Sequence, residues 1–395
     1  MKYEWGKRSL GEIASFTSGG TPSKNKPNYW GGTIPWVSAK TMKGTKISTS
    51  DLFITEEGLA KGSKLAPKGS ILLLTRGSGL FNDLPLCFVE SPVAFNQDVK
   101  CIRSKTEISN KYIFYWLMSQ KKYLMAKVGV TGIGAGKFDT DFLSSLEVPI
   151  PNKAERDAIV EIMDIITDKI SINKRINDNL QQQAIAIYKE WFLDSPEITK
   201  WPTVTLDNIT SLVSRGITPK YAVGSEQIVL NQKCIRDHSI DVSLGRSHTP
   251  KAITEKWLRY GDLLINSTGE GTLGRVAQVW FIPENITVDS HVTIVRPKTQ
   301  SLYFYVGLWG ITHEKEIEAL HTGSTGQTEL PRDRLKAMEL RLPDDDLLAR
   351  FNSVIQPMFS TIVANQSENV RLAGIRDTLL PKLLSGEINV SSIQP

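Results

Sequence analysis

Two glycine-rich segments of the sequence resemble phosphate-binding loops. Residues 269–274 read GEGTLG, the spacing of a dinucleotide-binding loop, which works only where a helix begins and turns its N-terminus toward the pyrophosphate. Residues 275–282 are strand-like instead, so the glycines are predicted to form a hairpin. Residues 132–137 end in the Gly-Lys pair of a phosphate loop. However, Thr131 stands where its first glycine belongs, and Phe138 stands where a magnesium-binding hydroxyl belongs. Neither segment predicts nucleotide binding.

Acidic residues and histidines could hold a metal ion, but their pattern argues against it. Asp83, Asp98 and Lys100 resemble the acidic pair and lysine of a metal-dependent nuclease. The second half of the chain has His291-Val292-Thr293 at the corresponding place, so a surface Asp–Lys pair is the favoured interpretation. No two histidines are four residues apart, and no Asn/Asp-Pro-Pro-aromatic motif of an amino-methyltransferase occurs. The sequence therefore predicts neither a catalytic site nor a metal site in this chain.

The composition is that of a globular protein with a slight excess of positive charge. Of 395 residues, 47 are Lys or Arg and 42 are Asp or Glu, and this net charge of +5 permits a nucleic-acid partner without requiring one. The longest aliphatic run, residues 71–74, is far too short to cross a membrane, and the first residues lack the apolar core of a signal peptide. Cys87, Cys101 and Cys234 stand far apart, so we expect reduced thiols in a cytoplasmic protein.

The sequence contains an internal repeat. The paired segments are Trp5–Ile13 with Trp201–Ile209, Gly20–Pro22 with Gly216–Pro219, Gly69–Gly79 with Gly261–Gly271, and Leu146–Pro151 with Met338–Pro343. From Gly69 onward the offset is mostly 192 residues (261 − 69 and 343 − 151). Two copies are too few for a solenoid, so they predict two similar domains related by an approximate two-fold axis.

Each copy begins with strand-like, loop-rich sequence. Residues 261–266 and 293–296 are examples of short apolar runs bounded by Gly, Pro and Asn. A helix is predicted at Lys111–Ala126, with its counterpart at Leu302–Leu320. We therefore expect two α+β domains, and the predicted boundaries are 1–151 for the first domain and 195–343 for the second.

A long helical pattern follows each domain, at residues 152–194 and 344–386, and a tail follows at 387–395. The apolar seam of the first helix consists of Ile159, Met163, Ile166, Ile170, Leu180, Ala184, Ile187 and Trp191. A shift of 192 gives Phe351, Ile355, Met358, Ile362, Leu372, Arg376, Leu379 and Leu383. Roughly 40 residues at ~1.5 Å each make a helix ~60 Å long. Pro357 is expected to interrupt the second helix.

Asparagines lie on the seam of both helices, at Asn173 and Asn177 and at Asn365 and Asn369. Asparagines in register in both copies predict polar contacts that align the helices, and a seam that opens locally to water is the alternative. The first helix also carries apolar residues off the seam: Val160, Ile162, Ile165, Ile172, Ile176 and Ile185. They would pack either on the chain's own domains or on the helices of a partner subunit.

Four stretches resemble the specificity subunits of type I restriction–modification systems. They are GTPS and YWGGTIPW at 20–23 and 29–36, GDLLINSTGEGTLGR with VDSHV at 261–275 and 288–292, GSTGQTEL at 323–330, and 372–388 with its RDTLLPKLLSGEI sequence. The resemblance runs nearly end to end and includes the repeat. The chain departs from the family at 153–156 and 344–346, where many members have a Glu-Gln pair that opens the helix.

The resemblance implies an α+β fold with two pseudo-two-fold-related target-recognition domains, separated by two long antiparallel α-helices. It implies a chain that reads a bipartite double-stranded DNA target and has no catalytic site or cofactor of its own. It also implies two modification (methyltransferase) subunits, which bind S-adenosylmethionine and methylate adenine, and a separate restriction subunit that acts as motor and nuclease.

Side chains that bond to base edges or phosphates stand in corresponding loops of both copies. In the first copy they are Thr21, Ser23, Lys24, Lys40, Lys43, Arg76, Ser78, Asn96, Gln97 and Lys137. In the second they are Arg215, Lys220, Tyr221, Gln232, Lys233, Arg236, Ser267, Thr268, Thr272, Arg275, Ser290, His291, Ser324, Thr325 and Gln327. Any one of them could be an ordinary solvated loop residue, but as a set they form the predicted DNA-binding face.

Two other interpretations stay open. A self-contained DNA methyltransferase or nuclease would bind S-adenosylmethionine or cleave DNA by itself. A recognition subunit of another defence system could share the same architecture, and its neighbouring genes would distinguish it.

Overall fold

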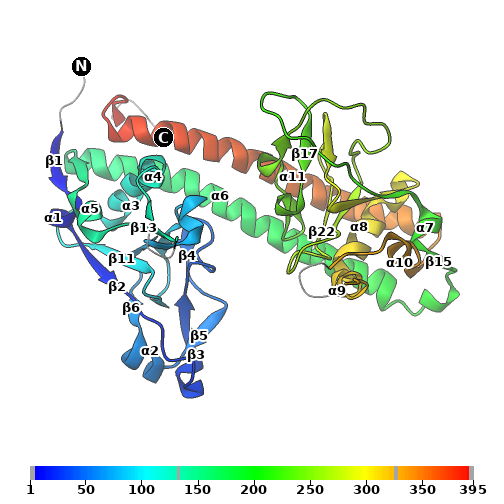
Figure 1. The fold of residues 1–395 in the computed structure, drawn as a ribbon, viewed down its shortest axis with the longest axis horizontal. Coiled ribbons are helices and arrows are strands. Elements are labelled where there is room, and N and C mark those ends of the chain that lie inside the picture. The colour runs from blue at the N-terminus through cyan, green and yellow to red at the C-terminus, as the bar shows by residue number, and fades with distance from the viewer. Residues whose placement is uncertain (1–4, 131–133, 324–327, 391–395) are drawn as a thin grey trace. The chain divides into compact units, whose positions relative to one another are not determined.

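The computed structural model describes residues 5–130, 134–323 and 328–390. The chain forms two compact units: unit 1 comprises Met1–Ser171 and Asn369–Pro395, and unit 2 comprises Ile172–Glu368. The two long helices, α6 (Lys153–Tyr188) and α11 (Asp345–Leu384), each contribute one part to unit 1 and the other part to unit 2 (Figure 1). Both units contain helices and sheets, as the α+β prediction requires.

Unit 1 is built around a five-stranded sheet in the order β2-β11-β7-β9-β4. Its strands are β2 (Ala14–Ser18), β4 (Lys46–Ile47), β7 (Ile71–Leu74), β9 (Leu86–Val89) and β11 (Val99–Ser104). All neighbours are antiparallel except β4 and β9. The four aliphatic residues of β7 are at most 1% exposed, which requires that both faces of the sheet are covered.

The apolar residues on one side of this sheet pack against helices. These helices are α3 (Asn110–Ser119), α4 (Lys121–Met125) and the unit 1 parts of α6 and α11. The two long helices contribute Ile159, Met163, Leu380 and Leu383 to this core. The Oγ atom of Ser109 accepts a hydrogen bond from the Tyr112 N–H (3.2 Å) and so caps the start of α3.

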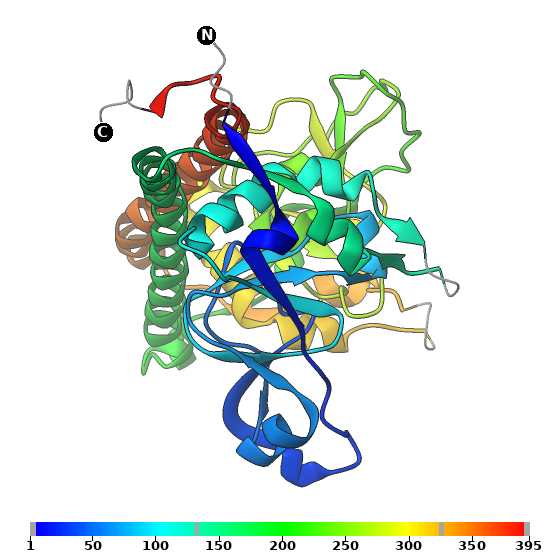
Figure 2. The same cartoon turned by 90° about the vertical axis from the view of Figure 1, so that its left-hand side faces the viewer.

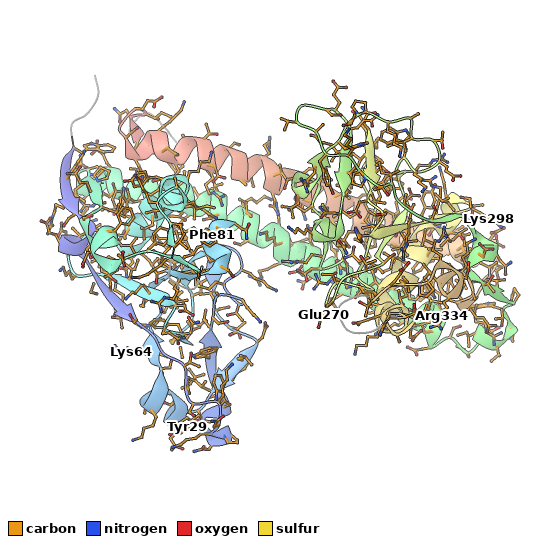
Figure 3. All side chains as sticks on the ribbon, in the orientation of Figure 1. Tyr29, Lys64, Phe81, Glu270, Lys298 and Arg334 are labelled. Atoms are coloured by element: carbon orange, nitrogen blue, oxygen red, sulfur yellow. The ribbon has the colours of Figure 1, made fainter. Side chains whose placement is uncertain are left out.

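A second, smaller sheet of unit 1 forms a lobe of its own (Figures 1 and 2). Its order is β5-β3-β10-β6, and its elements are β3 (Trp30–Val37), β5 (Leu52–Ile54), α2 (Glu56–Gly62), β6 (Lys64–Ala66) and β10 (Val93–Phe95). Trp36, Ile54 and Ala94 form its small apolar core. Tyr29 and Lys64 mark this lobe in Figure 3.

The remaining elements of unit 1 are short. They are β1 (Gly6–Ser9), α1 (Leu10–Ile13), η1 (Pro27–Tyr29), β8 (Arg76–Gly77), η2 (Ser78–Phe81), β12 (Gly129–Val130), β13 (Gly136–Lys137), α5 (Thr140–Ser145) and β14 (Glu147–Ile150). β1 pairs with β14, and β12, β13 and β8 form a three-stranded ribbon.

Unit 2 repeats this plan with a four-stranded antiparallel sheet in the order β16-β24-β21-β22 and a smaller sheet in the order β20-β17-β23. The strands are β15 (Thr203–Thr205), β16 (Thr210–Arg215), β17 (Ile228–Leu230), β18 (Ile235–Arg236), β19 (Ser239–Ile240), β20 (Arg246–Ser247), β21 (Leu263–Asn266), β22 (Val276–Gln278), β23 (Ile286–Val288), β24 (Val292–Pro297) and β25 (Glu339–Arg341). The α-helices are α7 (Leu206–Ile209), α8 (Tyr303–Thr312), α9 (Glu314–Ala319) and α10 (Arg332–Lys336). Single helical turns lie at Lys189–Leu193, Ile198–Lys200, Gln232–Cys234, Val242–Leu244 and Gln300–Leu302.

A buried ion pair joins β24, a central strand of the large sheet of unit 2, to the residue that precedes β21, the other central strand. Arg296 donates from Nε to Oδ1 and from an η nitrogen to Oδ2 of Asp262, both at 2.7 Å, and it also bonds to the carbonyls of Glu255 and Trp257. Asp262 is 1% exposed. Burial raises the pKa of the Asp262 carboxyl, and the arginine opposes that rise. The arginine thereby holds the segment before β21 in place.

The shorter predicted helices, 111–126 and 302–320, are each two helices. The first breaks at Gln120, between α3 and α4, and the second breaks at His313, between α8 and α9. At the first break the Gln120 N–H donates to the carbonyls of both Trp116 and Leu117, which tightens the last turn. The chain changes direction there, and Leu124 and Ile317 are still buried in their cores.

The long helices follow the predicted seam. In unit 2, Asn365 donates from Nδ2 to Asn177 Oδ1 (2.8 Å), and Asn177 donates to the Ile362 carbonyl (3.3 Å). Asn173, earlier in α6, donates to Glu368, later in α11 (2.7 Å), so the two helices run antiparallel there. The predicted contact between seam asparagines is confirmed. The expected interruption of the second helix at Pro357 is wrong, because α11 continues through this residue. Ile355, two residues before the proline, is still buried. Among the described residues, no helix is long and apolar enough to span a membrane.

Candidate nucleic-acid interface

In unit 1 the end of β7 is joined to two loops by backbone hydrogen bonds. The Thr75 N–H donates to the Asp98 carbonyl (2.8 Å), and the Phe138 N–H donates to the Thr75 carbonyl (2.9 Å). These bonds place β8 against β13, with Arg76 directly opposite Lys137. Two long cationic side chains are therefore presented side by side where the central strand ends.

Unit 2 contains the same hydrogen bonds at the end of β21. The Ser267 N–H donates to the His291 carbonyl (2.8 Å), and the Leu330 N–H donates to the Ser267 carbonyl (2.9 Å). Thr268 then lies opposite Glu329 in an isolated antiparallel bridge. Thr268 and Glu329 stand 192 residues after Arg76 and Lys137 (268 − 76 and 329 − 137). The two units therefore repeat these backbone hydrogen bonds but carry different side chains at the corresponding positions.

In unit 1 the structure brings together five of the predicted residues. Thr21 donates from its hydroxyl to Gln97 Oε1 (2.7 Å), and the neighbouring Asp98 carbonyl also accepts from the Arg76 N–H (3.3 Å). Asn96 bonds to Asp98, and Lys137 pairs with Asp139. Arg76 is exposed and forms no ion pair with any described residue. This group is suited to contacts with guanine edges or phosphates.

In unit 2 a connected polar cluster stands at the corresponding place. Gln232 donates from Nε2 to Thr268 Oγ1 (2.8 Å), which also contacts His291 Nδ1 (2.8 Å). Arg215 pairs with Glu329 at 2.6 Å. The Thr272 hydroxyl bonds to the Thr268 carbonyl (3.2 Å). Amide, imidazole and hydroxyl groups dominate here, where unit 1 presents two cations.

Two predicted residues lie in the core. Ser267 is fully buried, and its hydroxyl shares a hydrogen bond with Thr293 Oγ1 (2.6 Å). Asn96 is 7% exposed. Arg275 is partly exposed, but it donates to the Gly271 carbonyl (2.7 Å), so a contact with a base would need this bond to break. Ser267 and Asn96 therefore support the candidate interface from within the core of each unit.

The other predicted residues are spread over separate loops. Ser23, Lys24, Lys40 and Lys43 are exposed in the loops of unit 1, and Ser78 is exposed in η2. Lys220, Tyr221, Lys233 and Arg236 are exposed in unit 2, and Ser290 is partly buried. Ser324, Thr325 and Gln327 lie outside the described residues. The structure thus gathers part of the predicted set and leaves the rest dispersed.

Sequence reasoning missed two residues of unit 2, one in this cluster and one apart from it. Glu329 could have been found from Lys137 through the 192-residue offset. Arg246 lies over the Tyr221 ring, but nothing in its local sequence distinguishes it from other charged loop residues. The GEGTLG segment forms the turn between β21 and β22, which pair antiparallel, so the predicted hairpin is confirmed.

The side chains of this site are hydrogen-bonding and charged groups. In the described parts of the chain, no group of three or more His, Cys, Asp or Glu side chains could hold a metal ion. Asp83 pairs with Lys121, and Lys100 donates to the Ser18 hydroxyl (2.7 Å). Asp98 and Lys100 are partly exposed at the start of β11, in agreement with the interpretation as surface residues of a strand. Burial raises the pKa of Cys87 to about 12, so its thiol is protonated at neutral pH and is a poor nucleophile.

Several known proteins are similar to this chain in sequence. The family model "Type I restriction modification DNA specificity domain" matches residues 2–182. The chain is 26% identical to the type I restriction enzyme MjaIX specificity subunit of Methanocaldococcus jannaschii, over 99% of this chain and 95% of that protein. It is 35% identical to the EcoR124I/EcoR124II specificity subunit of Escherichia coli over 49% of each chain.

A solved structure is similar as well. The S subunit of the type I restriction–modification system from M. genitalium aligns with 96% of this chain and 96% of its own length, with a TM-score of 0.55 and 16% identity. The fold and the comparisons define a class of protein with two α+β units and two long helices. The chain is similar over nearly its whole length to a specificity subunit of a type I restriction–modification system, and its first half matches the DNA specificity domain of that family, which supports a DNA-recognition subunit.

Proposed function

We propose that this chain reads a split DNA target, one half with each unit, and has no catalytic site of its own. The observation that carries the proposal is the duplicated scaffold at the ends of β7 and β21. The same backbone bonds present Arg76 and Lys137 in unit 1 but Thr268 and Glu329 in unit 2. A backbone that is kept while its displayed side chains change suits two surfaces that read different base sequences.

The chemistry of the two surfaces supports different half-sites. Arg76 and Lys137 match the acceptor atoms of guanine and the phosphates, whereas an amide such as Gln232 matches adenine. Glu329 would repel a phosphate and could accept a hydrogen bond from cytosine. The two units are therefore expected to select different bases.

The partners we propose are two modification subunits, which methylate adenine, and a restriction subunit with motor and nuclease activity. Support for a helical partner comes from α6. Ile165, Ile172 and Ile176 are 55%, 49% and 39% exposed, and their spacing of seven and four residues places them on one helix face. The other off-seam residues (Val160, Ile162 and Ile185) pack against the chain's own cores. We define Ile165, Ile172 and Ile176 as the α6 stripe.

We also propose that S-adenosylmethionine is held by the modification subunits and that this chain binds no cofactor. The glycine-rich segment 269–274 supports this, because it leads into strand β22 and not into a helix whose N-terminus could face a phosphate or a cofactor. The assembled complex would then be an adenine methyltransferase and, with the restriction subunit, an endonuclease.

The test is an exchange of residues 1–150 for the first domain of another family member. Methylated sequences are mapped after co-expression with the modification subunits. We expect one half of the target to change while the other half stays the same. A swap that altered both halves would show that the units do not read independently.

A further inference from the structure

A stacked arginine–tyrosine pair lies in unit 2, apart from the polar cluster around Thr268. The guanidinium carbon of Arg246, on β20, is 3.5 Å from the centroid of the Tyr221 ring, which is a face-on stacking distance. Arg246 is exposed, and the Tyr221 side chain is 39% exposed. Within the described residues, the guanidinium of Arg246 has no hydrogen bond or ion pair, so its N–H groups are free to meet a ligand.

The backbone holds both members of this pair. The segment around Tyr221 runs alongside β20: Tyr221 forms a bridge with His248, and the Ala222 N–H donates to the Ser247 carbonyl (3.1 Å). On its other side β20 pairs with β17, where Arg246 is opposite Val229. The arginine therefore projects from a strand that is hydrogen-bonded on both sides.

Stacking gives this arginine the geometry that base reading needs. The Tyr221 ring holds the guanidinium flat, and its N–H donors then point outward in one plane. Two of them can meet the O6 and N7 acceptors of a guanine in the major groove. Because the side chain is oriented before binding, less rotamer entropy is lost when the contact forms.

The position and the charge of the surroundings also favour DNA. Val229 is three residues before Gln232, which contacts Thr268 in the polar cluster. At ~3.3 Å per residue of extended chain, Val229 and Gln232 are separated by at most about 10 Å, the length of about three base pairs of duplex at ~3.4 Å each. Residues 215–260 contain eight Lys or Arg but four Asp or Glu, a net charge of +4 in a chain whose total is +5.

We propose that Arg246, held flat by Tyr221, is a specificity-determining residue that reads a guanine in the half-site of unit 2. The assignment rests on the proposed function, because it takes unit 2 to read its own half-site. Unit 1 also has a cation beside a tyrosine, but Lys26 donates from Nζ to Tyr29 Oη (3.2 Å), and the Tyr29 ring is 6% exposed. Lys127 also lies over the Tyr123 ring in unit 1. A lysine is a point charge without a planar fork, so among the described residues the stacked arginine belongs to unit 2.

The test is selection from a pool of randomised DNA duplexes by the full chain in complex with its modification subunits. The wild-type complex is expected to enrich a split sequence. Arg246→Ala should make one G·C position in one half-site degenerate and weaken binding to the wild-type sequence by about 5- to 150-fold. Arg246→Lys keeps the charge and can still donate to guanine, but it loses the planar fork that the Tyr221 ring holds flat, so it should read the same position less strictly than the wild type does.

Tyrosine variants test the stacking itself. Tyr221→Phe keeps the ring and should retain the wild-type sequence preference, whereas Tyr221→Leu should lose part of the discrimination at the same position. Arg259→Ala is the matched control, because Arg259 is an exposed arginine of unit 2 that lies before β21, away from the strand ends that carry the polar cluster. Enrichment of the remaining positions of the same half-site by each variant shows that unit 2 of the variant is folded.

Three results would overturn the assignment. An Arg246→Ala complex that enriches the wild-type sequence unchanged would show that Arg246 reads no base. Uniform weakening for all sequences, with the salt dependence reduced by about one counterion, would make Arg246 a phosphate contact. A wild-type complex that enriches no sequence would overturn the proposed function itself, and this assignment with it.

Discussion

At the scale of single residues, backbone geometry explains more of the repeat than side-chain chemistry does. A Cβ atom built on Gly19 would lie 2.0 Å from the Phe95 carbonyl oxygen, and one on Gly216 would lie 2.0 Å from that of Val288. Glycine is required at both places because the chain passes directly over the strand that carries those carbonyls. The two units therefore keep the residues that shape the loops, while Arg76 in one unit corresponds to Thr268 in the other.

The buried Arg296–Asp262 pair gives a prediction about stability. Asp262→Asn keeps the volume but removes the negative charge, so the arginine is left buried without its counter-ion. We expect unit 2 to lose about 3–5 kcal/mol of stability, seen as a lower midpoint in a denaturant titration that follows the tryptophan fluorescence of the full chain.

The matched control for this variant is Asp207→Asn, also in unit 2. Asp207 pairs with Lys336 at 3.1 Å, and its side chain is 56% exposed, so the change should cost less than about 1 kcal/mol. Equal effects of the two variants would mean that burial does not govern the Arg296–Asp262 pair.

At the scale of elements, periodicity predicted the long helices and missed the breaks in the short ones. The seam residues of α6 and α11 recur every three or four positions, and a buried helix face imposes this spacing wherever it packs. The breaks at Gln120 and His313 carry no such signal, because they depend on how each helix turns back over its own core. Neither position is occupied by a proline or a glycine that would indicate a break in the helix.

The candidate site was predictable only in part for a related reason. The offset of 192 residues and the loop composition located Thr268 and Lys137. Polar side chains of a loop look alike in sequence whether they face solvent or the core, so Ser267 was included although it is fully buried. Arg246 was left out because its importance comes from Tyr221, 25 residues earlier (246 − 221).

The seam asparagines give a prediction about the pairing of α6 with α11 in unit 2. Asn177→Leu removes the acceptor of the Asn365 amide, which is bonded at 2.8 Å, and we expect a loss of about 1–3 kcal/mol because a partly buried donor is left unpaired. The double variant Asn177→Leu, Asn365→Leu should regain most of that loss, since both partners are then apolar. Denaturant midpoints of the two single variants and the double variant measure the coupling.

The double variant also tests what the asparagines are for. If they fix the register of the helices, the double variant should keep its stability but bind the wild-type split target less selectively. Losses in the two single variants that simply add in the double variant would show that the two side chains do not depend on each other.

At the scale of the whole molecule, the surfaces proposed for recognition and for assembly are different ones. The polar clusters lie at the strand ends of each unit, whereas the α6 stripe lies on a helix that contributes to both units. A change on the stripe should therefore affect the binding of partner subunits without changing which bases are read.

The last prediction separates these two roles. The purified chain alone should bind no S-adenosylmethionine and methylate no DNA, and methyl transfer should appear only when modification subunits are added. Ile172→Lys together with Ile176→Lys should abolish that transfer, because two charges would be buried against the apolar partner surface. The free chain should stay folded, because both side chains are already exposed. Radiolabelled methyl transfer, together with co-purification of the modification subunits, measures both effects.

Gln182→Lys is the control, since Gln182 is exposed on the same helix and lies about 80° around the axis from Ile172, at ~100° per residue. It should leave both methyl transfer and co-purification at the wild-type level. Methyl transfer by the chain alone would contradict the adaptor role. Full assembly of the Ile172→Lys, Ile176→Lys variant would instead leave that role intact and place the partner surface elsewhere than on the α6 stripe.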